Sequence, residues 1–442
     1  MDVETTGVAP RSGVPGDGAA SAGSPALGIS TEIETEKARE SRRSRYARRA
    51  EGQSAIRGFF EGEYVAGRLD DGYPTWVDER TGEIRPQLPK VCKCSWALGD
   101  HVYIRGGDGV GASWSQTQRC ASIWACPVCS SVIRTERAKE IQQGVAEHQA
   151  RGGSLVFVTL TLRHRRRHEL KDTLKLLRAA YPNWRNDRMV KSFFEEHGYV
   201  GRVRALEITH GEANGWHPHL HILVFLDGAV SADETAGFKR TAFEVWKRVV
   251  LLKAGQLGLT AVTPYLDRDG RGGVDVQLVD GDGRVLARYL SKVQDDHRKW
   301  NVGAEMGRSD VKSGNEDNLT PFQLLDRTGD VGRDARNRML FASYYVATKG
   351  VHAMDWSPHM KELYGIGDRT DEDIIADVRG ERIAYRTTRG DYRHLRRSPS
   401  LHATVLDWAE DGDWDLVNAT LPGLRLDEET GRMLADSFDG KG

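Results

Sequence analysis

The chain has 442 residues, with 63 Lys and Arg against 64 Asp and Glu, 39% hydrophobic residues and five cysteines. That length allows two or three domains with an ample buried core, so the fold does not depend on disulfides. The sequence shows neither an apolar run of the roughly 18 residues that span a bilayer nor the apolar core of a signal peptide. We therefore exclude membrane, secreted and fibrous proteins and expect a soluble cytoplasmic protein.

The nearly balanced charge conceals an uneven distribution along the chain. Residues 151–191 hold eleven Lys and Arg against three Asp and Glu, whereas residues 401–442 hold ten acids against three bases. A basic stretch and an acidic tail are compatible with nucleic-acid binding, although they do not require it.

The first fifty residues predict disorder, because large apolar side chains are scarce there. An arginine-rich run, KARESRRSRYARR, ends this segment at residues 37–49. Two interpretations of the run are open: a helix that touches DNA, or a solvated charged tail.

Alternating helical and strand patterns follow. Strands are expected at 155–162, 202–209, 219–226 and 274–279, and helices at 136–149, 168–180, 232–254 and 284–294. The short, turn-rich connection between the second and third strands favours an antiparallel pair. The sequence therefore predicts an α+β fold, a central antiparallel sheet with helices packed on one face.

Three histidines in HPHLH form the sharpest local feature of the sequence. His217, His219 and His221 alternate along a strand, so they share a face. Three imidazoles at this spacing favour a divalent metal site, although surface histidines of this kind also occur without one.

A fourth candidate ligand comes from the hairpin. If the turn centres near Ala213, Glu207 lies directly opposite His219 and on the same face. The other interpretation of Glu207 is a solvent-facing carboxylate, and one bulge would reverse the assignment. Imidazoles with a carboxylate and open positions suit Mg²⁺ or Mn²⁺ acting on a phosphate.

Tyr289 and Lys292 lie three residues apart on an expected helix and so project from one face. A tyrosine hydroxyl can attack a phosphodiester and hold a covalent phosphotyrosyl intermediate. A nearby lysine can lower the phenol pKa or neutralise phosphate charge. The pair alone is a weak signal, since most such pairs are a half-buried Tyr beside a solvated Lys.

All five cysteines lie within one window, at Cys92, Cys94, Cys120, Cys126 and Cys129. The CPVC turn can point two thiolates at one centre, and Cys120 with either Cys92 or Cys94 would complete a structural zinc site. The other interpretation is a set of reduced, buried thiols.

Two basic stretches are candidates for DNA contact. The first is RHRRRH, after the first strand, with Arg163, Arg165, Arg166 and Arg167. It could equally be the solvated start of a helix. The second patch lies in the C-terminal segment and comprises Arg386, Arg389, Arg393, Arg396 and Arg397.

Three of these motifs together resemble those of a known superfamily. VTLTL (158–162), HPHLH (217–221) and RYLSK (288–292) are similar to the motifs of the HUH endonucleases, and most similar to those of plasmid rolling-circle replication initiators, the Rep family. The resemblance covers roughly residues 85–365. CASIWACPVCSSVIRTERAKEI (120–141) and TPFQLL (320–325) also resemble that plasmid family.

The resemblance implies a nickase mechanism. Such a protein cuts one strand at a plasmid double-strand origin, leaves a 3′ hydroxyl for polymerase and stays joined to the 5′ phosphate through tyrosine. His219 and His221 match the metal-binding histidines, Tyr289 matches the nucleophile and Lys292 the lysine of the tyrosine motif. The implied partners are single-stranded or supercoiled origin DNA, a host helicase and polymerase, and a second protomer in a homodimer.

We expect five segments along the chain. They are a disordered tail (1–50), a zinc module with a helix (85–150), the nickase domain (151–300), its extension (301–366, starting with a mobile loop) and a C-terminal segment with a possible DNA-binding role and an acidic tail (367–442).

One position departs from the family pattern. Some initiators carry a second Tyr or a Glu four residues before the nucleophile, where this chain has Val285. Termination would then use water activated by Asp282 or Asp295, or a second protomer. Tyr344 and Tyr345 also precede a lysine, but we interpret them as packing residues.

Two further classes of protein remain open. One is another HUH enzyme, a transposase or a relaxase. The other is a non-catalytic, zinc-containing DNA-binding regulator, in which Tyr289 would belong to the core.

Overall fold

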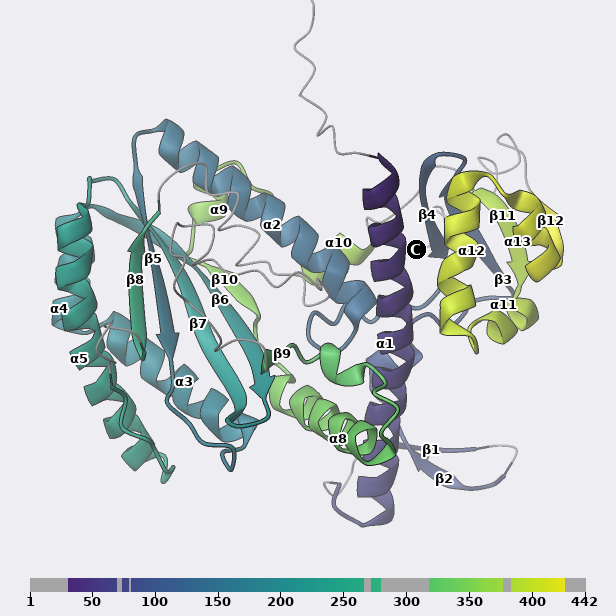
Figure 1. Ribbon diagram of the computed structural model, residues 1–442, viewed down its shortest axis with the longest axis horizontal. Helices are drawn as coiled ribbons and strands as arrows, with labels where there is room; N and C mark the ends of the chain where they lie inside the picture. Colours follow the sequence, from purple (N-terminus) through teal and green to yellow (C-terminus); the bar gives the residue numbers. More distant parts are fainter. Residues whose placement is uncertain are drawn as a thin grey trace, which may run out of the picture. The chain divides into compact units, whose positions relative to one another are not determined.

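The computed structural model describes residues 31–69, 74–78, 81–265, 272–279, 318–376 and 383–425 (Figure 1). The chain divides into two compact units, Met1–Ala38 and Arg39–Gly442. Of the first unit only the beginning of helix α1 is described. No helix in the described ranges is both long enough and apolar enough to cross a bilayer.

The elements are labelled as in Figure 1. In chain order they are α1 (Thr31–Val65), β1 (Thr75–Val77), β2 (Ile84–Pro86), η1 (Lys90–Lys93), β3 (His101–Gly107), β4 (Val110–Ser115), α2 (Pro127–Ala150), β5 (Ser154–Thr161), α3 (Leu170–Arg185), α4 (Arg188–Glu196), β6 (Tyr199–Gly211), β7 (Gly215–Leu226), α5 (Ala232–Gln256), β8 (Val274–Leu278), β9 (Asn318–Leu319), η2 (Gln323–Leu325), α8 (Val331–Thr348), β10 (Met354–Trp356), α9 (Met360–Leu363), α10 (Asp371–Ala376), β11 (Ile383–Thr388), α11 (Arg389–Leu395), α12 (Pro399–Asp411), α13 (Trp414–Thr420) and β12 (Gly423–Arg425).

The central sheet has the strand order β10-β6-β7-β5-β8, with β9 paired to β6, and these pairings are antiparallel. The four strands expected from the sequence are confirmed as β5 to β8. Strands β6 and β7 are longer than expected, because their pairing continues to Gly211 opposite Gly215. Helix α4 was not expected; Asp187 caps it by accepting from the Met189 N–H at 3.0 Å.

Helices cover both faces of the sheet, so the expectation of one covered face was wrong. On one face, alternate residues of β5, such as Val158, pack against α3 and α5 in the larger of the cores. Trp246 of α5 belongs to the same core. On the other face Phe157 packs with Ile141 and Val145 of α2. The unbroken apolar run LVFV in β5 is typical of a strand buried on both sides.

The expectation of disorder was wrong for residues 31–50, which belong to α1, while residues 1–30 lie outside the described residues. Arg42 contacts Asp407 at 3.0 Å and Glu410 at 2.6 Å, and Arg43 contacts Asp407 at 2.9 Å. Both acids lie on α12, more than 350 residues away in the sequence. Arg42 and Arg43 are therefore neither part of a free charged tail nor available to DNA, because distant carboxylates pair with them.

The C-terminal residues share a second sheet with an early part of the chain. Its order is β12-β11-β3-β4, and Thr387 of β11 pairs with Val102 of β3. Helices α11, α12 and α13 cover one face and form a separate core that includes Trp114, Tyr392 and Trp414.

The packing of α3 on the sheet predicts a large, local stability effect. Leu177 is fully buried in the main core, so Leu177→Ala is expected to lower the free energy of unfolding by about 2–5 kcal/mol. Leu252 on α5 is 55% exposed, so Leu252→Ala should change the free energy of unfolding by less than about 0.5 kcal/mol. Urea unfolding measures both, and equal effects would contradict this assignment of the core.

Candidate functional site

The β6–β7 hairpin has the register predicted from its turn. Glu207 pairs directly with His219, and Thr209 pairs with His217. Gly215 at the turn has a φ of +76°, a backbone conformation that favours glycine. The hairpin therefore places the acid and the histidines on one face of the sheet.

Three side chains of that face converge. A Glu207 carboxylate oxygen lies 3.1 Å from the Nε2 atom of His219 and 3.0 Å from that of His221. One ligand atom from each residue lies within 4.8 Å of the others. All three side chains are largely buried. The group could hold a metal ion.

Neighbouring groups orient both imidazoles. The Nδ1 atom of His221 lies 3.2 Å from the Thr159 hydroxyl, and the Nδ1 atom of His219 lies 3.2 Å from the carbonyl oxygen of His217. Phe157 stacks on the His221 ring at 5.5 Å. With the Nδ1 atoms so held, both Nε2 atoms face Glu207, as in metal sites whose histidines are fixed by a second hydrogen bond. Sequence reasoning missed Thr159 as a partner, although VTLTL contains it.

His217 lies apart from this group. Its Nδ1 atom is 2.6 Å from Nε2 of His164, whose own Nδ1 lies 2.9 Å from the Asn214 carbonyl oxygen. Burial, together with the neighbouring His219 and His164, lowers the pKa of His217 to about 3. Sequence reasoning missed His164, because this residue lies in a loop, where no periodic pattern indicates that it contacts His217 of β7.

Tyr289 and Lys292 lie outside the described residues, as do Asp282, Val285 and Asp295. The described chain leaves the central sheet after β8 and returns at β9, where Asn318 pairs with Gly211 of the hairpin.

Tyr344 and Tyr345 pack as expected. Tyr344 is fully buried and stacks on Trp216 at 5.6 Å, and Tyr345 contacts Phe60. They hold α8 and α1 together with the turn end of the hairpin.

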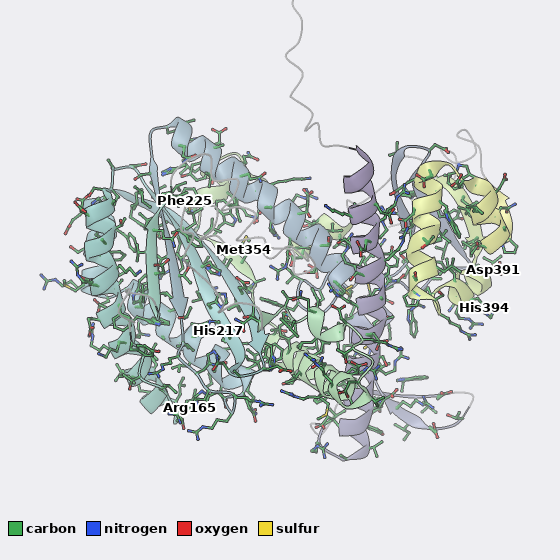
Figure 2. The ribbon with its side chains drawn as sticks, in the orientation of Figure 1. Arg165, His217, Phe225, Met354, Asp391 and His394 are labelled. Carbon is green, nitrogen blue, oxygen red and sulfur yellow. The ribbon has the colours of Figure 1, made fainter. Side chains whose placement is uncertain are left out.

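The basic loop after β5 lies at the same end of the sheet as His217. Figure 2 shows Arg165 on the outer side of the loop. Arg165, Arg166 and Arg167 are exposed, and among the described residues no carboxylate forms an ion pair with them. Arg163 instead contacts the Thr263 carbonyl oxygen and lies 4.1 Å from the centre of the Tyr265 ring. Three of the four predicted arginines are thus available to an anionic ligand.

Four cysteines form a second, fully buried group. The sulfur of Cys94 lies 3.8 Å from that of Cys129 and 3.7 Å from that of Cys126, and Cys120 lies 3.8 Å from Cys129. Cys126 caps α2 and Cys129 occupies its first turn, where the helix dipole favours thiolates. Hydrogen bonds from Cys120 and the other two thiols lower the pKa of Cys94.

Cys92 lies outside this group. Its sulfur contacts the Gln53 carbonyl oxygen at 3.9 Å, and burial raises the pKa of its thiol to about 11. The geometry thus favours Cys94 over Cys92 as the fourth member, an alternative that the sequence left open.

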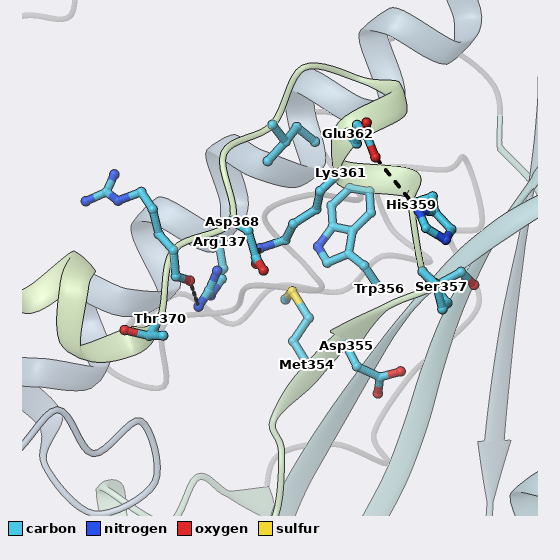
Figure 3. A pocket seen from close by; sticks show the side chains of 13 residues that line it. Arg137, Met354, Asp355, Trp356, Ser357, His359, Lys361, Glu362, Asp368 and Thr370 are labelled. Atoms are coloured by element: carbon cyan, nitrogen blue, oxygen red, sulfur yellow. Dashed lines mark hydrogen bonds and ion pairs between the residues drawn. The ribbon is translucent and has the colours of Figure 1, made fainter.

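A cavity of about 710 Å³ lies among α2, β10 and α9 (Figure 3). Its charged lining residues have ion-pair partners within the lining or beside it. Lys361 contacts Asp368 at 3.3 Å and His359 contacts Glu362, whereas Asp355 pairs with Arg202 of β6. Among the described residues, none of the site residues predicted from the sequence lines it.

Comparison with known proteins defines the class. A model of the family described as "Replication protein" matches residues 112–249, a segment that includes the β6–β7 hairpin. Protein rep of Streptomyces lividans is 31% identical over 356 residues, which cover 67% of this chain and 76% of that protein. The chain therefore belongs to the replication protein family of plasmid replication initiators.

A second relative matches a smaller part. The neomycin resistance protein of Streptomyces cyanogenus is 36% identical over 134 residues, 25% of this chain and 31% of that protein. No solved structure matches the chain.

The turn of the hairpin gives a testable prediction. A Cβ atom at Gly215 would lie 3.1 Å from the Arg166 backbone, so Gly215→Ala strains both the turn and the basic loop. We expect a loss of about 2–3 kcal/mol in the free energy of unfolding. Gly258 has a φ of +63° with no atom nearby, so Gly258→Ala should cost only about 1 kcal/mol. Equal losses in urea unfolding would contradict the contact.

Proposed function

We propose that this replication protein is a metal-dependent nickase that starts rolling-circle replication through a tyrosine nucleophile, as in the HUH endonucleases. The observation that carries the proposal is the convergence of Glu207, His219 and His221 on adjoining strands. Similarity of the VTLTL, HPHLH and RYLSK motifs to that superfamily supports it.

The donor set fits a divalent ion. Two imidazole nitrogens and one carboxylate oxygen leave coordination positions open for a phosphate oxygen, which suits Mg²⁺ or Mn²⁺. Such an ion, when bound, would polarise the scissile phosphate and neutralise its developing charge. Thr159 and the His217 carbonyl oxygen would keep both Nε2 atoms directed at it.

Tyr289 would supply the nucleophile. Its phenolic oxygen forms a bond to phosphorus while the bond from phosphorus to the 3′ oxygen breaks, so the number of phosphodiester bonds is conserved. The phenolic proton passes to solvent, and the departing 3′ oxygen takes a proton to become a hydroxyl. Lys292 would stabilise the phenolate and the charged phosphate.

The basic loop would hold the DNA strand that enters the site. Arg165, Arg166 and Arg167 are exposed beside the turn of the hairpin, where their charges can pair with phosphates. Host polymerase, with a helicase that unwinds the duplex, would first extend the free 3′ end. Termination would use water activated by Asp282 or Asp295, or a tyrosine from a second protomer, to cut the regenerated origin. The 3′ hydroxyl released by that cut would attack the phosphotyrosine, so that the strand closes and the phenolic oxygen of Tyr289 leaves.

We also propose that the four-cysteine group holds a structural zinc ion. A tetrahedral zinc with Zn–S bonds of about 2.3 Å separates its sulfurs by about 3.8 Å. The sulfur distances of 3.7–3.8 Å agree with that geometry. The ion would join the loop residues Cys94 and Cys120 to the start of α2.

Nicking is tested with Tyr289→Phe and, as the matched control, Tyr345→Phe. Wild type and the control are expected to nick supercoiled plasmid carrying the origin, in Mn²⁺ but not in EDTA, and to remain attached to the 5′ end. Tyr289→Phe should form no covalent adduct yet bind the same DNA, because only the attacking oxygen is missing.

Denaturing gels and mass spectrometry of the adduct measure this result. Origin binding without cleavage by the wild-type protein would contradict the nickase and favour the non-catalytic regulator. An adduct on another tyrosine would support the nickase activity but contradict the assignment of Tyr289 as the nucleophile.

The zinc proposal makes a separate prediction. Wild type and Cys92→Ser should each release one zinc per chain to a colorimetric chelator on unfolding, whereas Cys94→Ser should release much less, because three thiolates bind it more weakly. Zinc retained by Cys94→Ser but lost from Cys92→Ser would contradict the assignment.

A further inference from the structure

The C-terminal basic patch is not one surface. Arg386 lies on β11, and Arg396 turns inward, with its guanidinium 5.9 Å from the centre of the Trp96 ring. Arg389, Arg393 and Arg397 remain exposed. Arg389 and Arg393 lie four residues apart on α11 and so project from one side of it. Arg397 follows the C-cap residue of α11, in a turn where its N–H donates to the His394 carbonyl oxygen. We call these three arginines the α11 arginine face.

The core beneath holds this helix in place. Tyr392 and Leu395 are buried on its opposite side, and the Tyr392 hydroxyl donates to the Ser95 carbonyl oxygen at 3.1 Å. Thr388 caps the helix by accepting from the Asp391 N–H at 3.1 Å. The arginines are therefore carried by a fixed backbone, which lowers the entropy cost of using them in binding.

Their lack of acidic partners distinguishes these arginines from those of α1. In α1, Arg42 and Arg43 are paired with carboxylates of α12. Among the described residues, no carboxylate forms an ion pair with the arginines of the α11 face. The only acid between Arg386 and Ser398 is Asp391, and its carboxylate accepts a hydrogen bond from the Thr388 hydroxyl at 2.7 Å.

We propose that the α11 arginine face binds the phosphate backbone of duplex DNA and holds the initiator on its plasmid. The face is fixed, basic and separate from the Glu207, His219 and His221 group, since it belongs to the second sheet and its own core. Arginine is suited to phosphate, because its planar donors can form paired hydrogen bonds. The proposal depends on membership of the replication family and not on the nicking chemistry.

The test compares two triple variants of the full-length protein. Arg389→Gln, Arg393→Gln and Arg397→Gln remove the face. The control changes Arg178, Arg188 and Arg240 to Gln, which removes the same charge from exposed positions on α3, α4 and α5. Fluorescence anisotropy measures binding to an origin duplex and to a mixed-sequence duplex across a salt series.

Loss of three phosphate contacts should lower the slope of log affinity against log salt by about 3 and weaken binding roughly tenfold or more on both duplexes. The control should bind like wild type. Cleavage of a single-stranded origin oligonucleotide should be unaffected in the test variant. Fluorescence anisotropy measures DNA binding and does not require cleavage. The test therefore remains valid even if the protein proves not to be a nickase.

The proposal would be overturned if the test variant bound duplex DNA with the affinity and salt slope of the wild type. It would also be overturned if the control variant lost as much affinity as the test variant. If the test variant fails to fold, amide hydrogen exchange of the wild-type protein, with and without duplex DNA, tests the proposal instead. Protection of residues 389–397 on adding duplex supports the face, and unchanged exchange there overturns it.

Discussion

The candidate site depends on the register of one β-hairpin. Strands β6 and β7 begin their pairing at the turn, where Gly211 lies opposite Gly215. Continued along both strands, this register places Glu207 opposite His219. A slip of one residue in either strand would send its side chains to the opposite face, among the apolar residues of the larger core. The register is therefore fixed by burial: Leu206, Ile208, Leu220 and Ile222 fill that core, while the polar residues alternate with them.

Contacts at the turn support the same register. Gly215 permits the close approach of the Arg166 backbone, and Trp216 stacks on Tyr344 of α8. The basic loop and α8 are thereby attached to the end of the hairpin that carries His217. A single packing arrangement thus sets the geometry of the Glu207, His219 and His221 group and the place of the basic loop.

Helix α2 connects the two candidate metal groups. Cys126 is its N-cap residue and Cys129 lies in its first turn, and further along Ile141 and Val145 pack against the sheet face that bears the histidines. A zinc ion at the cysteines would fix the start of a helix whose middle supports the sheet. With zinc bound, the cysteine group would then serve to fix the start of α2.

The sequence predicted the features that rest on local periodicity and failed where distant residues decide. Strand alternation and turn symmetry were enough to place Glu207 opposite His219. The pairing of α1 arginines with Asp407 could not be predicted, since the partners are far apart in the chain. The choice of Cys94 over Cys92 and the pairing of His164 with His217 likewise depend on loop paths, which composition does not reveal.

The central claim is that Glu207, His219 and His221 hold one divalent ion. Pulsed electron paramagnetic resonance of the Mn²⁺-loaded protein tests it directly, because ligand nitrogens couple to the electron spin. We expect coupling to two imidazole nitrogens, reduced to one in either His219→Ala or His221→Ala and unchanged in His217→Ala. Mn²⁺ bound without imidazole coupling, or coupling lost only in His217→Ala, would contradict it.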